Sequence, residues 1–145
     1  MSTLVSTEIE QYVVDHTTPL PPNLQELVRV TCETMKDYQM LTGPVEGMLL
    51  QSLVWALGAR RVLEIGTFTG FSAQMMAAAL PDNGTVVTCE NDFKHAEMAR
   101  EYFTNEDGTM SCDVEKMVFS HFLLVFCVFF TRNTNRKWKK RDEQR

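Results

Sequence analysis

The stretch that decides the fold runs from Arg61 to Glu90 and reads RVLEIGTFTGFSAQMMAAALPDNGTVVTCE. Residues 61–65 form a short apolar strand that a glycine ends, and residues 85–89 form a second strand rich in β-branched side chains. The small residues of about 72–80 predict a helix between them, and residues 93–103 predict another. This order predicts a βαβα unit, and hence a parallel sheet with a right-handed crossover.

The residues before this unit are expected to form helices. Residues 7–14 suggest a short helix, and the proline-rich run 17–22 must be extended. Asn23 suits the N-cap of a second helix. Pro44 is placed to begin a third helix and Gly58 to end it. One apolar stripe is expected on this third helix, formed by Val45, Met48, Leu49, Leu53 and Leu57.

After residue 104 the sequence stops following this order. Residues 117–130 are almost purely apolar, but they fall short of the roughly 20 residues that a membrane span needs. They suit one buried strand or helix, or a segment that was never selected to fold. We therefore divide the chain into residues 1–104 and a divergent tail, 105–145, with a basic end.

The charge of the chain is uneven. Residues 1–131 hold 17 acidic and 7 basic side chains, whereas residues 132–145 hold 2 acidic and 7 basic ones. The acidic body argues against nucleic acid as the main partner, because phosphate contacts need clustered cations. The four cysteines form no C-x-x-C pair, and no secretory leader is recognisable. We therefore expect reduced thiols and a cytoplasmic protein.

The motif that carries chemistry is the turn Glu64 to Gly70, which reads EIGTFTG. Parallel sheets bind ligands beyond the carboxyl ends of their strands, where this turn lies. Gly66 lets a ligand approach the backbone, and Gly70 lets the following helix pack tightly. The G-x-x-x-G spacing differs from the G-x-G-x-x-G of NAD sites. It favours adenosylmethionine, which has no pyrophosphate.

Two acidic residues complete this motif. Glu90 ends the second strand, where a carboxylate can accept hydrogen bonds from both ribose hydroxyls; taken alone, it could be a solvated residue. Glu64 lies in an apolar strand, and buried carboxylates are rare unless partnered. Its alternative role is a structural acid that caps neighbouring N–H groups. The strands, glycines and acids in this order together predict an adenosylmethionine site.

With these residues the chain resembles the caffeoyl-CoA and catechol O-methyltransferase group of class I S-adenosylmethionine-dependent O-methyltransferases. The resemblance covers roughly residues 20–104. It rests on GPVEGMLLQSLV (43–54), on the stretch 61–90 and on AEMAREYF (96–103). It implies an α/β, Rossmann-like class I methyltransferase fold of which the chain holds only the N-terminal part, helices followed by one βαβα unit. The chain would then be C-terminally truncated or divergent.

The resemblance also implies a cofactor-binding set. Its members are Met40, Thr42, Glu64, Gly66, Thr67, Ser72 and Glu90. Glu64 and the backbone of the turn would lie against the methionine part of S-adenosylmethionine. Ser72 would hydrogen-bond the cofactor's carboxylate, and Glu90 would bind its ribose. Met40 and the nearby threonine would close over the methyl group, although Met40 could equally pack in the core.

Relatives in this group also bind a divalent cation, usually Mg²⁺, through two aspartates and an asparagine in motifs that are missing here. We therefore name no metal ligand and no catalytic residue. The implied activity is methyl transfer to a hydroxyl of a small catechol-like or phenolic acceptor, with inactivity of this chain alone left open. Alternatives are a non-catalytic adenosylmethionine-binding or dimerisation module that modulates a full-length relative, and a disfavoured NAD-binding fragment. A homodimer stays open, and no membrane partner is expected.

Overall fold

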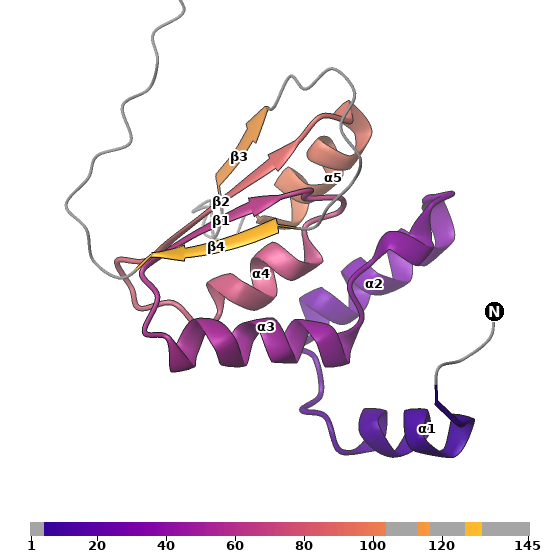
Figure 1. Ribbon diagram of the computed structural model, residues 1–145. Helices are drawn as coiled ribbons and strands as arrows, with labels where there is room; N and C mark the ends of the chain where they lie inside the picture. The colour runs from indigo at the N-terminus through magenta and orange to yellow at the C-terminus, as the bar shows by residue number, and fades with distance from the viewer. Residues whose placement is uncertain (1–4, 104–112, 117–126, 132–145) are drawn as a thin grey trace, which may run out of the picture.

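The computed structural model describes residues 5–103, 113–116 and 127–131, which form an α/β fold (Figure 1). In chain order its elements are α1 (Thr7–Asp15), α2 (Pro22–Thr34), the 3-10 helix η1 (Tyr38–Met40), α3 (Pro44–Ala56), β1 (Arg61–Ile65), α4 (Phe71–Ala77), β2 (Thr85–Glu90), α5 (Phe93–Phe103), β3 (Asp113–Lys116) and β4 (Cys127–Thr131). The predicted order of strand, helix, strand, helix is confirmed. α4 ends three residues earlier than the sequence suggested.

The sheet has the order β3-β2-β1-β4. β1 pairs in parallel with β2, as predicted, and this register places Glu64 opposite Thr88. β3 is parallel to β2, whereas β4 runs antiparallel beside β1. Both outer strands come from the segment interpreted as a divergent tail, so this segment adds strands to the sheet. Within the apolar run, residues 117–126 lie outside the described residues, and the division at residue 104 stays a prediction.

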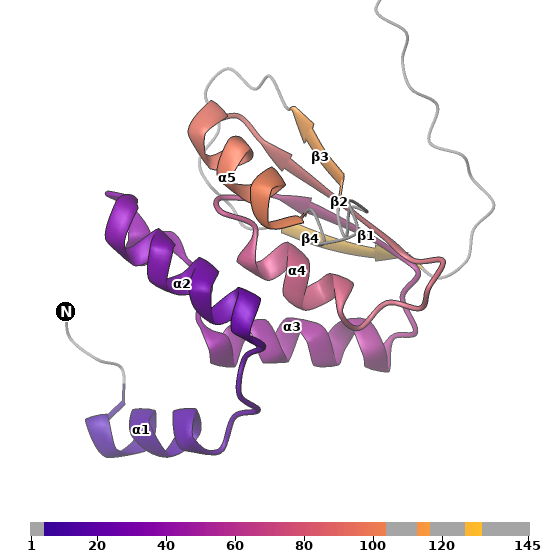
Figure 2. The same cartoon turned by 180° about the vertical axis from the view of Figure 1, so that it is seen from behind.

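α4 and α5 cover the same face of the sheet, and α3 packs along α4 (Figure 2). On this face β1 buries Val62 and Glu64, and β2 buries Val86 and Thr88, with exposures of 2% or less. Apolar side chains from the helices close the core over them: Val54, Ala73, Met76, Ala99 and Phe103. Glu64 and Thr88 are therefore polar residues inside a hydrophobic layer.

The predicted N-cap of the second helix is wrong. α2 begins at Pro22, with Pro21 as its N-cap, because proline has a helical φ and lacks the N–H that a first turn leaves unpaired. Asn23 lies inside that first turn, and its side chain donates a 3.5 Å hydrogen bond to Gln74 on α4.

The prediction for α3 is also wrong, because the apolar stripe is not the face that packs against α4. α3 does begin at Pro44, and Gly58 follows it with a φ of 57°. Its buried residues are Gly47 and Val54, whereas four of the predicted stripe residues are exposed: Val45, Leu49, Leu53 and Leu57. Gly47 decides the face, because a Cβ there would lie only 2.9 Å from Met75 and Phe71 of α4.

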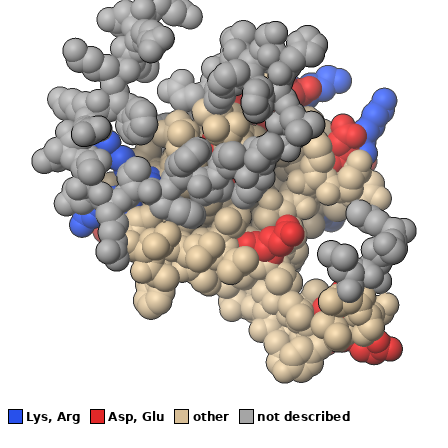
Figure 3. All heavy atoms as spheres, viewed as in Figure 1, with Lys and Arg blue, Asp and Glu red and all other residues tan. Residues whose placement is uncertain are grey.

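The outer face of α3 presents a largely uncharged surface (Figure 3). Leu49 is 60% exposed and Trp55 is 77% exposed. None of the helices in the described ranges is long and apolar enough to cross a membrane.

Candidate functional site

The turn between β1 and α4 is wound tightly against the end of β2. The N–H groups of Gly66 and Thr67 donate to the carbonyl oxygen of Cys89, at 2.9 and 3.2 Å. Gly66, Phe68 and Gly70 have positive φ angles of 100°, 50° and 89°. A left-handed backbone at Phe68 is strained, because this residue has a side chain, and such strain gathers at ligand sites.

Gly70 makes room for a neighbouring helix, although not the one predicted. An added Cβ would lie 2.5 Å from Cε1 of Phe103 and 3.2 Å from Cβ of Ala99, both on α5. The close packing that the sequence assigned to the helix after the turn is therefore made by α5, while Gly70 itself is the N-cap of α4.

Glu64 is a fully buried carboxylate whose partners are hydroxyls. Ser72 donates to its Oε1 at 2.6 Å, and Thr88 donates to its Oε2 at 2.5 Å. Burial raises the pKa of Glu64 to about 7, the two hydroxyl donors oppose this shift, and the nearby charge of Glu90 adds to it. A carboxylate in this setting gains or loses its proton near neutral pH.

Glu90 lies at the carboxyl end of β2 and is only half-buried. Its Oε2 accepts the N–H of Phe68 at 2.7 Å, and its Oε1 accepts the N–H groups of Asn91 and Asp92 at 2.9 Å. The carboxylate therefore holds the strained residue of the turn and the start of the next loop together. These contacts contradict a solvated residue without a structural role.

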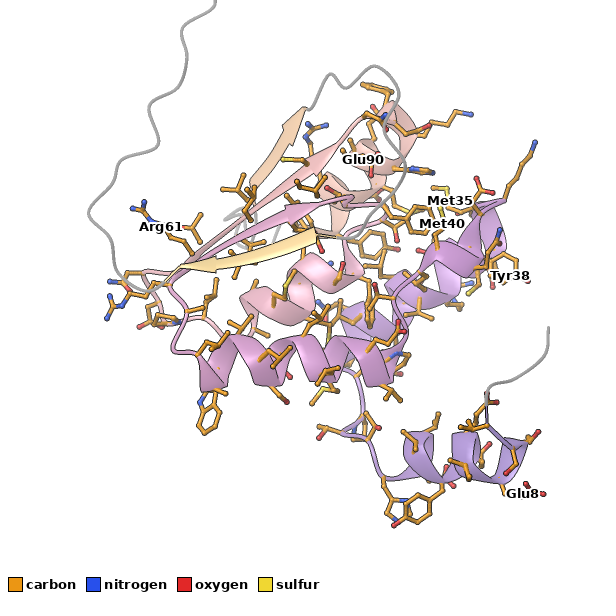
Figure 4. The ribbon with its side chains drawn as sticks, viewed as in Figure 1. Glu8, Met35, Tyr38, Met40, Arg61 and Glu90 are labelled. Carbon is orange, nitrogen blue, oxygen red and sulfur yellow. The ribbon has the colours of Figure 1, made fainter. Side chains whose placement is uncertain are left out.

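The other predicted site residues are distributed unevenly around this turn. Figure 4 shows Met40 and Glu90 at the same end of the molecule, beyond the carboxyl ends of β1 and β2, with Arg61 at the opposite end. Met40 is 40% exposed, which is not the exposure of a core residue. Thr42 is half-buried in the loop before α3. Ser72 uses its hydroxyl hydrogen on Glu64. The cofactor roles of all these residues stay predictions.

Sequence reasoning missed the buried threonines. Thr88 contacts Glu64 and also lies 2.6 Å from the hydroxyl of Thr67 in the turn. On the other side of the turn, Thr31 of α2 donates to Thr69 at 2.9 Å, with both side chains fully buried. The available signal was the alternation of Thr67 and Thr69 within the turn and the position of Thr88 one residue before Cys89 in an otherwise mostly apolar strand.

The residues present fit the cofactor that the motif predicts. Glu64 is buried and accepts hydrogen bonds from two neutral hydroxyls, which do not neutralise its charge when it is ionised, so this charge can attract a cationic group of a ligand at the turn. Glu90 is half-buried beside the turn, where its carboxylate can also accept hydrogen bonds from hydroxyls. Within the described ranges, no three His, Cys, Asp or Glu side chains lie close enough together to hold a metal ion.

Comparison with protein families gives a match to the O-methyltransferase family model over residues 14–116. A mouse protein named catechol O-methyltransferase domain-containing protein 1 is 33% identical over 104 residues, which are 72% of this chain and 39% of that protein. Maize caffeoyl-CoA O-methyltransferase 1 is 32% identical, over 67% of this chain and 38% of that protein. The chain thus spans well under half the length of these relatives.

Among solved structures, the O-methyltransferase of Bacillus cereus in complex with SAH is similar, with a TM-score of 0.65 and 34% identity. The match covers 76% of this chain and 50% of that one. A methyltransferase of Podospora anserina, 20% identical, has a TM-score of 0.70 and supports the fold.

Proposed function

This chain belongs to the O-methyltransferase family, and from that premise we propose that it binds S-adenosylmethionine and transfers its methyl group to a hydroxyl of a small catechol-like or phenolic acceptor. The observation that carries the proposal is that Glu64 and Glu90 lie on either side of the strained turn, Glu90 bound to the N–H of Phe68 and Glu64 to the hydroxyl of Ser72. The Bacillus cereus relative, solved with SAH, supports the same ligand class here. Because the chain covers only part of its relatives, the acceptor is proposed from their names alone.

In this proposal the protein acts by binding and orientation. The cofactor supplies a methyl group already activated on a sulfonium, so alignment with the acceptor hydroxyl contributes most of the rate. Glu90 would hold the ribose, and Gly66 and Thr67 would leave the backbone open to the methionine part. Met40 and Thr42 would cover the cofactor near the methyl group. Ser72 would reach the ligand carboxylate only by turning its hydroxyl away from Glu64.

Calorimetric titration of the full chain with S-adenosylmethionine tests this proposal. We expect micromolar binding, and a loss of about 100-fold or more in Glu90→Ala, because hydrogen bonds to a charged acceptor contribute about 1.5–3 kcal/mol each. Glu97→Ala, at an exposed position of α5, is the matched control and should bind like the wild type. A folded chain that binds NAD but no S-adenosylmethionine would disprove the function.

We also propose that the chain forms a homodimer through the outer face of α3, where Val45, Leu49 and Leu53 are exposed at successive turns of the helix, because exposed apolar side chains that gather on one face mark an interaction surface. Leu49→Lys places a charge in the centre of this face and should convert the dimer to a monomer in light scattering. Gln25→Lys, on the exposed side of α2, should leave the mass unchanged. A wild-type chain that is monomeric at high micromolar concentration would contradict this proposal.

A cytoplasmic location is proposed as well. Neither Cys32 nor Cys89 forms a disulfide with another described residue, and reduced thiols are usual in a reducing compartment.

A further inference from the structure

Thr88 connects the buried carboxylate to the turn. It lies opposite Glu64 in the β1–β2 register, and its Oγ1 is 2.5 Å from Oε2 of Glu64. The same Oγ1 is 2.6 Å from Oγ1 of Thr67, and both threonines are at most 1% exposed. The side chains of Thr67, Thr88 and Glu64 form a hydrogen-bonded chain that is shielded from water and runs from the turn into the core.

The direction of these hydrogen bonds depends on the charge of Glu64. A charged carboxylate only accepts, so Thr88 must donate to Glu64, and Thr67 must then donate to Thr88. A neutral carboxyl can donate its own hydrogen, which lets Thr88 donate to Thr67 instead. The contact between Thr67 and Thr88 permits either direction. Donation by Thr88 thus stabilises the charged form of Glu64 specifically.

We propose that Thr88 is a positioning residue of the cofactor site, which stabilises the charged form of Glu64 and thereby makes the site favour a ligand that carries an additional positive charge. This inference rests on the proposed function. The buried charge reaches the ligand without direct contact, because the surrounding core screens it far less than water does.

Among the described residues, Glu90 is the ionisable group whose charge acts on Glu64. Glu90, at the end of β2, raises the pKa of Glu64 by repulsion between the two negative charges. The thiol of Cys89, which precedes Glu90 in β2, is buried. α4, whose Ser72 contacts the carboxylate, has no ionisable side chain. Thr88 is therefore one of two donors, with Ser72, that offset burial and the charge of Glu90.

Two ligands of similar shape but different charge test this inference. S-adenosylmethionine carries a positive sulfonium, and S-adenosylhomocysteine lacks this charge along with the methyl group. We would measure the Kd of each for the full chain between pH 5.5 and 8.5. For the wild type, the preference for S-adenosylmethionine should rise severalfold as pH passes the pKa of Glu64, about 7.

Thr88→Val removes the donor while keeping the shape of the side chain. The midpoint of this rise should move up by about one pH unit or more, as expected for a lost hydrogen bond to a charged group. Thr88→Ser restores the hydroxyl and should return the midpoint towards the wild type. Glu64→Gln should make the preference independent of pH.

Thr31→Val is the matched control. It removes an equally buried hydroxyl, which bonds Thr69 and does not contact Glu64, so its midpoint should equal that of the wild type. An unshifted midpoint in Thr88→Val, or an equal shift in Thr31→Val, would overturn the inference while the proposed function stands. If the wild type binds neither ligand at any pH, the proposed function fails and the positioning role fails with it.

Discussion

Replacement of Gly70 by alanine is expected to lower the free energy of unfolding by about 3 kcal/mol or more. Two costs combine at this position. A φ of 89° is unfavourable for any residue with a side chain, at about 1–3 kcal/mol. The new Cβ would also lie 2.5 Å from the ring of Phe103, which is fully buried and cannot move without shifting α5, at about 1–3 kcal/mol.

The measurement is urea unfolding followed by circular dichroism, with Gly43→Ala as the control. Gly43 precedes α3 with a φ of −75°, and an added Cβ there meets nothing within 4 Å. Gly43 is the N-cap of α3, where alanine is less favourable than glycine, so the control should lower the free energy of unfolding by about 1 kcal/mol or less. A Gly70→Ala protein as stable as this control would show that α5 does not pack on the turn.

Glu64→Gln is expected to make the protein more stable than the wild type at pH 8, by up to about 3 kcal/mol. The pKa of Glu64 is about 7 in the folded chain, against an ordinary value of 4.5. Between these values the folded state holds a proton that the unfolded state has lost. Wild-type stability therefore falls as pH rises from 4.5 to 7, by about 1.4 kcal/mol per unit of pKa shift.

Glutamine resembles the neutral carboxyl and still accepts a hydrogen bond, so this part of the pH dependence should disappear. Unfolding free energies measured at intervals from pH 4.5 to 8.5 would show a flatter profile for Glu64→Gln. Glu97→Gln makes the same chemical change at an exposed position of α5 and should retain the wild-type profile. Equal profiles for all three proteins would mean that folding does not raise the pKa of Glu64.

Local patterns were enough to predict the central unit. The strands at 61–65 and 85–89, the turn glycines and the helix over 93–103 all match the structure, because each is encoded within a few consecutive residues. The same reasoning failed at Asn23. Asparagine favours an N-cap, but proline also favours the start of a helix, and α2 begins at Pro22 instead. It also failed at α3, whose apolar residues lie on every side, so periodicity could not choose a face.

The sequence by itself determined the family, the glycine turn and the two acidic residues, since short-range spacing carries all three. Only the tertiary structure decided what these residues contact. The pairing register brings Thr88 to Glu64, and the approach of α5 makes Gly70 necessary. Packing likewise turns the other face of α3 outward. These contacts join residues far apart in the chain, and their energies depend on burial, which no local pattern encodes.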